Sequence, residues 1–205
     1  MKRILIISSV ILIIILIFIK IYPSQSPQLS VNYEDSIREG RVQKDLYMKN
    51  DPNSPFVLQH EPFKGLKYFN IDKAFRVTGR VSPFPGLQHI RMHMSDGTTE
   101  SYLKYATISF YLVGEPQSLI MYKSEDLSGS DSYFIPFYDE TSTASTYGAG
   151  RYLDVDYIGG SAIVLDFNLA YNPYCAYVEG YSCPVPPAEN RITVKVEAGE
   201  KKYKP

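Results

Sequence analysis

The hydrophobic and polar positions change their period twice along the chain. Residues 4–22 are almost continuously apolar, and Lys20 carries the only charge among them. Between residues 32 and 50 the apolar residues recur at helical spacing, and from residue 75 onward they alternate with polar ones. These patterns predict an apolar segment, one amphipathic helix and then a series of β-strands.

The apolar segment is about as long as the hydrocarbon core of a bilayer requires. A cleavable signal usually has a shorter apolar region that ends in small residues, whereas Phe18, Ile19 and Ile21 stand here. We therefore expect residues 1–22 to form an uncleaved signal anchor, with a cleaved signal peptide as the alternative. Its flanking charges, Lys2 and Arg3, predict a cytoplasmic N-terminus, so that the remainder faces the periplasm or the cell exterior. The membrane, entered through residues 4–22, is the expected partner.

Residues 23–30 contain two prolines and read as a spacer, and residues 31–205 read as a single domain. Asn32, followed by two acidic residues, is typical of a helix start. The apolar stripe of this helix is expected to comprise Tyr33, Ile37, Val42 and Leu46.

Strands are expected where apolar and polar residues alternate, with hairpin turns at Asp96-Gly97 and Gly159-Gly160. The expected strands cover residues 75–81, 89–94, 106–112, 119–122, 133–137, 152–157, 162–168 and 192–197. Seven to nine short strands with frequent turns predict a mainly β domain, an antiparallel sandwich or barrel with one N-terminal helix.

Charge and composition narrow the possible partners. Without Lys2, Arg3 and Lys20, 18 of the 21 basic residues remain against 22 acidic ones, which argues against nucleic acid as a partner. The aromatic residues are 18 Tyr and 10 Phe, with no Trp. This tyrosine content is typical of β-sheet faces that are partly exposed to solvent, or of a binding surface.

A metal or cofactor is not expected. His89 and His93 share a strand face, but four residues of strand span about 13 Å, too far for two ligands of one ion. Met92 and Met94 point to the opposite face and are expected in the core.

Residues 134–201 hold a dense series of polar groups between glycine and proline turns, as binding sites do. Within them, Leu165 and Phe167 should point into the core, which directs Asp166 and Asn168 together to the other face. This pair either meets a ligand or holds the neighbouring loops by hydrogen bonds.

A second candidate lies between residues 137 and 151, where Asp139, Tyr147 and Arg151 are embedded among small polar residues. Arg151 could grip a carboxylate or phosphate with two hydrogen bonds. It could equally form a structural clamp with Asp139 or Asp166.

The third candidate covers residues 171–190 and contains both cysteines of the chain, Cys175 and Cys183. Outside the cytoplasm such a pair most often forms a disulfide, and two separate thiols are the alternative. A nucleophilic Cys175 would need a base, and the histidines are distant in sequence. Glu189 could act as a general acid or base where it is desolvated.

A series of short motifs runs through most of the expected domain. These motifs are Lys44-Asp45, Ser54-Pro55, Phe63-Lys64-Gly65-Leu66, Tyr68-Phe69, Asp72, Phe75-Arg76-Val77, Pro136-Phe137, Asp139, Thr146-Tyr147-Gly148, Gly150-Arg151-Tyr152-Leu153, Leu165-Asp166-Phe167-Asn168, Ala170-Tyr171-Asn172-Pro173, Cys175-Ala176-Tyr177, Cys183-Pro184, Pro186-Pro187, Glu189-Asn190 and Ala198-Gly199-Glu200-Lys201. Together they resemble domain-of-unknown-function family 1684, a bacterial group with no assigned activity. Thr143 stands where that family favours glycine. The resemblance implies no reaction.

The leading functional hypothesis is a membrane-tethered domain that binds a small polar or glycan-like ligand in a loop-covered pocket. The ligand-binding residues would be Tyr147, Arg151, Asp166, Asn168, Tyr171, Asn172, Tyr177 and Asn190. The alternative is a hydrolase in the same pocket, with Asp139, Asp166 or Glu189 as acid or base and Arg151 stabilising negative charge. A purely structural envelope module is the third possibility.

Overall fold

The computed structural model describes residues 32–124 and 133–204. Contacts divide the chain into two compact units, Met1–Asp35 and Ser36–Pro205, and the fold below is that of the second. The expected anchor over residues 1–22 and the spacer over 23–30 lie outside the described residues. Among the residues described, no helix is long and apolar enough to cross a membrane.

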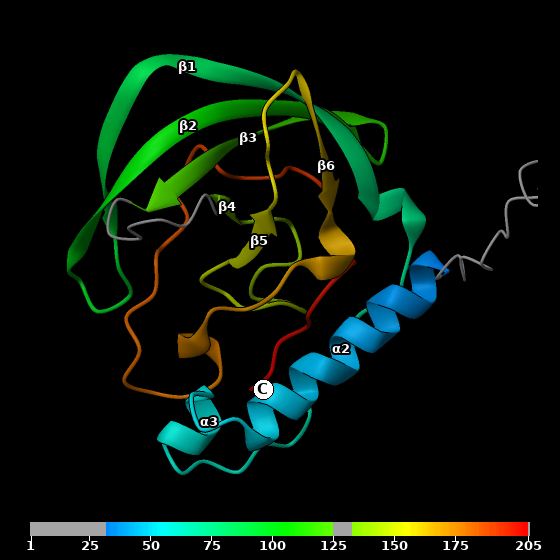
Figure 1. Cartoon of the computed structure of the whole chain (residues 1–205), viewed down its shortest axis with the longest axis vertical. Coiled ribbons are helices and arrows are strands. Elements are labelled where there is room, and N and C mark those ends of the chain that lie inside the picture. Colours follow the sequence, from blue (N-terminus) through cyan, green and yellow to red (C-terminus); the bar gives the residue numbers. More distant parts are fainter. Residues whose placement is uncertain (1–31, 125–132, 205) are drawn as a thin grey trace, which may run out of the picture. The chain divides into compact units, whose positions relative to one another are not determined.

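Six antiparallel strands form one curled sheet with the order β5-β4-β3-β2-β1-β6 (Figure 1). The prediction of a mainly β, antiparallel domain is confirmed. The described strands belong to a single sheet, and its two edge strands are not joined by a ladder. The strands are β1 (Arg76–His93), β2 (Thr99–Leu112), β3 (Glu115–Ser124), β4 (Tyr133–Phe137), β5 (Arg151–Val155) and β6 (Ala162–Asp166).

The long strand β1 joins two segments that the sequence predicts as separate strands. Its pairing with β2 shifts register between Pro83 and Gln88, and the proline-containing bulge lets one strand continue past the interruption. Met92 and Met94 are buried, as the alternation predicts, while His93 is exposed. The core of the sheet therefore follows from period-two burial.

Two helices precede the sheet, α2 (Tyr33–Asn50) and the short α3 (Pro55–Leu58). The predicted apolar stripe of α2 is wrong in part, because Val42 and Leu46 are 56% and 48% exposed. Ile37 is buried as predicted.

The buried side of α2 is defined by Ile37, Arg41, Lys44 and Met48, which are spaced by four, three and four residues. Ile37 and Met48 are buried, and the two basic residues between them are half-buried. Arg41 Nη1 donates a hydrogen bond to the carbonyl of Phe69 at 2.9 Å. Polar partners on the domain, rather than an apolar stripe, thus decide which face of the helix turns inward.

Three single-turn 3-10 helices, η1 (Lys73–Phe75), η2 (Phe167–Leu169) and η3 (Tyr174–Ala176), complete the regular structure of the described residues. The expected strand over residues 162–168 ends early, at Asp166. Its side chain accepts a hydrogen bond from Asn168 N at 3.1 Å and so caps η2. Local side-chain capping here replaces further strand pairing.

Residues 192–197 keep the predicted alternation, with Ile192 and Val196 fully buried, yet they form no regular strand. Part of their backbone pairs with residues 138–140, since Ile192 N donates to Tyr138 O at 2.8 Å and Glu140 N donates to Val194 O at 3.3 Å. Side chains bind other backbone groups: Asp139 Oδ1 accepts from Val196 N at 3.2 Å, and Gln117 Oε1 accepts from Thr193 N at 3.0 Å. Backbone and side-chain partners together thus hold this segment in place of a regular ladder.

One buried guanidinium fastens the end of the chain (red in Figure 1) to the sheet. Arg151 is 1% exposed, and its Nη2 donates to Asp139 Oδ2 and to Val196 O, both at 2.9 Å. Its Nη1 donates to the carbonyls of Ala198 and Glu200, at 2.5 and 3.2 Å. Burial lowers the pKa of Arg151, and the charge of Asp139 opposes that effect. Arg151 thus forms the clamp with Asp139 that was one of its two predicted roles.

We expect Asp139→Asn to lower the free energy of unfolding by about 3 kcal/mol, because it leaves a buried guanidinium without its counter-charge. Glu189→Gln is the matched control. It makes the same change in an exposed pair with Lys104, at 2.7 Å, and should have an effect of at most about 1 kcal/mol. Denaturant unfolding of the full-length chain in detergent measures both, and equal effects would contradict the clamp.

Gly199 provides a second test of this segment. Its φ is +74°, and a Cβ there would lie 2.4 Å from Ala170 O and 2.7 Å from Phe167 O. Gly199→Ala should therefore destabilise the domain by about 3 kcal/mol, through backbone strain and overpacking together. At Gly159, with φ +105° and no atom within 4 Å, the same substitution should have only the strain effect of about 1–2 kcal/mol.

Candidate functional site

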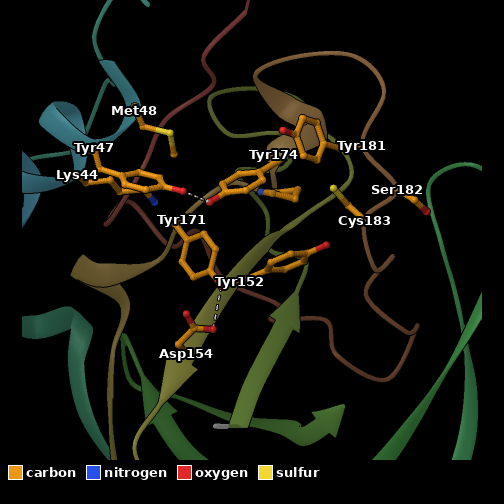
Figure 2. Close-up of a pocket in the computed structure, with 11 residues that line it drawn as sticks. Lys44, Tyr47, Met48, Tyr152, Asp154, Tyr171, Tyr174, Tyr181, Ser182 and Cys183 are labelled. Atoms are coloured by element: carbon orange, nitrogen blue, oxygen red, sulfur yellow. Dashed lines mark hydrogen bonds between the residues drawn. The ribbon is translucent and has the colours of Figure 1, made fainter. Parts of the chain in front are cut away.

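A tyrosine-lined pocket of about 450 Å³ opens between α2, β5 and the loop that follows η2 (Figure 2). We call it the tyrosine pocket. Its aromatic lining consists of Tyr47 from α2, Tyr152 from β5, and Tyr171, Tyr174 and Tyr181 from the loop. Such a pocket combines apolar ring faces with hydroxyl groups that can form hydrogen bonds.

Ring contacts hold the walls of the tyrosine pocket in place. The rings of Tyr152 and Tyr171 meet edge to face at 5.8 Å, and those of Tyr174 and Tyr181 at 5.3 Å. The hydroxyls of Tyr47 and Tyr174 are 3.3 Å apart and share a hydrogen bond (Figure 2). The walls are thus braced across elements that are far apart in sequence.

Two charged side chains lie at the polar side of the tyrosine pocket. Tyr171 donates its hydroxyl proton to Asp154 Oδ1 at 2.8 Å (Figure 2). Lys44 Nζ lies 4.5 Å from the centroid of the Tyr171 ring, within cation–π range. Burial and the neighbouring carboxylate of Asp154 raise the pKa of Tyr171, so its hydroxyl remains a donor at neutral pH.

Lys44 is held from beneath by a buried carboxylate that the sequence reasoning did not select, that of Glu200. Glu200 is 1% exposed, and its Oε1 lies 2.7 Å from Lys44 Nζ. Its Oε2 accepts from Asn172 N and Asn172 Nδ2, both at 3.0 Å, and from the hydroxyl of Tyr177. The motif Ala198-Gly199-Glu200-Lys201 was the only sequence signal for this residue.

The two cysteines meet beside the tyrosine pocket, which Cys183 lines. The structure contains both as free thiols, and their disulfide stays a prediction. Cys175 N donates to Cys183 Sγ at 3.3 Å, and the hydroxyl of Tyr147 donates to Cys175 Sγ at 3.8 Å. The hydrogen bond from the Cys183 thiol and that from Tyr147 lower the pKa of Cys175 to about 6, although burial opposes them.

The remaining predicted site residues bind other parts of the protein. Asp166 pairs with Arg76 Nε at 3.5 Å and accepts from Asn168 Nδ2 at 3.1 Å. Asn168 holds Asp72 by two backbone hydrogen bonds, at 2.8 and 2.9 Å. Asp166 and Asn168 therefore hold a loop by hydrogen bonds, which is one of their two predicted roles. Arg151 is bound to Asp139.

Asn190 and Glu189, the last two predicted site residues, also have intramolecular partners. Asn190 is fully buried, exchanges hydrogen bonds with the backbone of Ile120 at 2.8 Å, and donates to Pro136 O at 2.8 Å. It thereby joins β3 to β4. Glu189 is exposed, and its ion pair with Lys104 lowers the pKa of its carboxyl group.

Of the predicted ligand-binding residues, Tyr171 lines the tyrosine pocket, and Asn172 and Tyr177 lie beneath it on Glu200. Sequence reasoning missed the other aromatic walls and the charged groups Lys44 and Asp154. Lys44 and Tyr152 belong to the motifs quoted above, which was the available signal. No group of three or more metal-ligating side chains is found among the described residues.

Two comparisons with known proteins found a match. A family model described as "Protein of unknown function (DUF1684)" matches residues 61–201. The solution NMR structure of an uncharacterized protein from Haloarcula marismortui is similar to the chain, with 36% sequence identity and a TM-score of 0.63. The match covers 82% of this chain and 94% of that one. No curated protein matches the chain. Because the family model covers more than half of the sequence, the protein belongs to the DUF1684 family.

Proposed function

We propose that the tyrosine pocket binds a small polar, glycan-like ligand. The observation that supports this best is the set of five tyrosines around a pocket of about 450 Å³, a volume typical of small-molecule sites. Ring faces suit the apolar faces of a sugar, and phenolic hydroxyls suit its hydroxyl groups.

The charges around the tyrosine pocket favour a neutral or cationic ligand. Lys44 carries the basic charge of the lining, and Glu200 neutralises it at 2.7 Å. Asp154 is exposed, so one of its oxygens can accept hydrogen bonds from a ligand while the other binds Tyr171. An anionic sugar would meet this carboxylate without a free cation to offset it.

Binding is favoured over hydrolysis because the charged side chains predicted as catalytic already interact with other parts of the protein. Arg151 and Asp139 are buried in their mutual pair, and Asp166 caps η2. Among the described residues that line the tyrosine pocket, Asp154 is the one carboxylate. Glycoside hydrolysis commonly uses two carboxyl groups on opposite sides of the scissile bond.

The same proposal places the domain outside the cytoplasm on a membrane anchor. It rests on the sequence of residues 4–22, which matches a bilayer in length and follows Lys2 and Arg3. A mildly acidic, tyrosine-rich domain on a short spacer would meet envelope glycans directly.

Neutral sugars should raise the melting temperature of the full-length chain. Maltotriose, cellotriose and chitotriose are suitable neutral probes, with glucuronic acid as the anionic comparison. At ten times its dissociation constant a probe stabilises by about 1.4 kcal/mol, which corresponds to a shift of about 3–5 °C for a domain of this size. Differential scanning fluorimetry in detergent measures this shift.

Tyr181→Ala and Asp154→Asn should each remove at least half of that shift. The first substitution removes an aromatic wall of the tyrosine pocket, and the second removes its exposed carboxylate acceptor. Tyr111→Ala is the matched control, since Tyr111 is 70% exposed on β2 and does not line the pocket. Equal shifts in all three variants would rule the tyrosine pocket out as the binding site.

The anchor has its own test. Membranes from cells that produce the full-length chain should retain it after washing at alkaline pH, which releases peripheral proteins but not membrane-spanning helices. Replacing Leu12 and Leu16 by aspartate places two charges in the apolar segment and should release the protein, at about 2.5–3.5 kcal/mol of insertion free energy for each charge. Release of the unaltered chain would contradict the anchor.

A further inference from the structure

The thiols of Cys175 and Cys183 differ in their access to solvent. Cys175 is half-buried on η3, whereas Cys183 is 6% exposed on the following loop. In a pair that exchanges disulfides, one sulfur must be reachable from outside and the other must lie within reach of the first. The partial exposure of Cys175 suits the first role, and the 3.3 Å contact between Cys175 N and Cys183 Sγ places the two residues side by side, as the second role requires.

We propose that Cys175 and Cys183 form a thiol–disulfide exchange site, in which Cys175 attacks an external disulfide and Cys183 resolves the mixed disulfide. The substrate class is a small or protein-borne disulfide that reaches the half-buried sulfur. This inference does not depend on whether the tyrosine pocket binds a sugar.

Hydrogen bonds prepare Cys175 for the attack. The Tyr147 hydroxyl donates to its sulfur at 3.8 Å, an arrangement that favours the thiolate. Burial raises the pKa of Tyr147 to about 12, so this donor keeps its proton at neutral pH. The lowered pKa of Cys175 increases the thiolate fraction of this cysteine at neutral pH.

The backbone around Cys183 is held firmly, so that its sulfur stays within reach of Cys175. Ser95 N donates to Cys183 O at 2.8 Å, and Cys183 N donates to Ser95 Oγ at 3.0 Å. The Tyr152 hydroxyl binds Pro184 O at 2.5 Å. Cys183 Sγ lies 3.3 Å from Cys175 N, so the resolving sulfur already contacts the residue that it must attack.

The exchange is balanced in atoms and electrons. The Cys175 thiolate attacks one sulfur of the external disulfide, forms a mixed disulfide and releases the other sulfur as a thiolate, which takes up a proton. The Cys183 thiol then loses its proton, attacks Cys175 Sγ and releases the second external thiol. Two electrons pass from the cysteine pair to the substrate, which leaves as two thiols, and of the two protons taken up one comes from the Cys183 thiol and the other from solvent.

Oxidised glutathione is the probe for this site. The full-length chain, reduced and held in detergent, is mixed with it at pH 7, quenched with acid and analysed by mass spectrometry. The unaltered chain should form the internal Cys175–Cys183 disulfide. The Cys183→Ser variant should keep glutathione bound to Cys175, and the Cys175→Ser variant should gain no adduct. Absence of the adduct on Cys175 in a folded Cys183→Ser variant would overturn the assignment.

Alkylation with iodoacetamide between pH 4.5 and 9 tests the roles without removing either sulfur. Cys175 should react at least tenfold faster than Cys183 at pH 7, with a midpoint near pH 6. Tyr147→Phe should raise that midpoint, because it removes a donor to the thiolate, whereas Tyr111→Phe should not change it. Faster alkylation of Cys183 than of Cys175 would identify a structural pair instead. An internal disulfide that excess reduced glutathione cannot reduce in the folded protein would do the same.

Discussion

The buried pair of Arg151 and Asp139 is the constraint on which the end of the domain depends. A guanidinium removed from water loses much hydration free energy. The Arg151 guanidinium donates to four acceptors, and these hydrogen bonds compensate for that loss. Three of them are the backbone carbonyls of Val196, Ala198 and Glu200. Together with the backbone hydrogen bonds that Gly199 and Lys201 form with Phe69 and Lys67, the Arg151 side chain fixes the register of this segment.

That register has consequences for the candidate site. Because residues 196–200 are fixed, the carboxylate of Glu200 is held under the tyrosine pocket, where it binds Lys44, Asn172 and Tyr177. Lys44 belongs to α2 and the other two belong to the loop after η2. Glu200 therefore joins a helix at the start of the domain to a loop near its end, and both contribute walls to the tyrosine pocket. Its burial is tolerable only because each oxygen has partners.

The sequence predicted what depends on local periodicity and failed where distant partners decide. The buried face of β2 between Ala106 and Leu112 follows from alternation, since each inward position meets the same core. The face of α2 could not be predicted, because Lys44 turns inward toward a carboxylate 156 residues later in the chain. Tyr171 could be predicted because it lies within a polar loop. Asp154 lies on a strand, where the sequence pattern predicts an ordinary exposed residue.

The tyrosine pocket and the thiol pair share one side chain, that of Cys183, and this links the two proposals physically. If Cys183 bonds to Cys175 as proposed, the bond involves a residue that lines the pocket, so a bound ligand and the disulfide would each act on the same side chain. Linkage is reciprocal: if oxidation changes the affinity for a ligand, that ligand changes the redox equilibrium by the same factor. Tyr152 lies between the two proposed sites, since its ring forms a wall of the pocket and its hydroxyl binds the residue after Cys183. A strand that holds this tyrosine in place thus connects the two proposed sites.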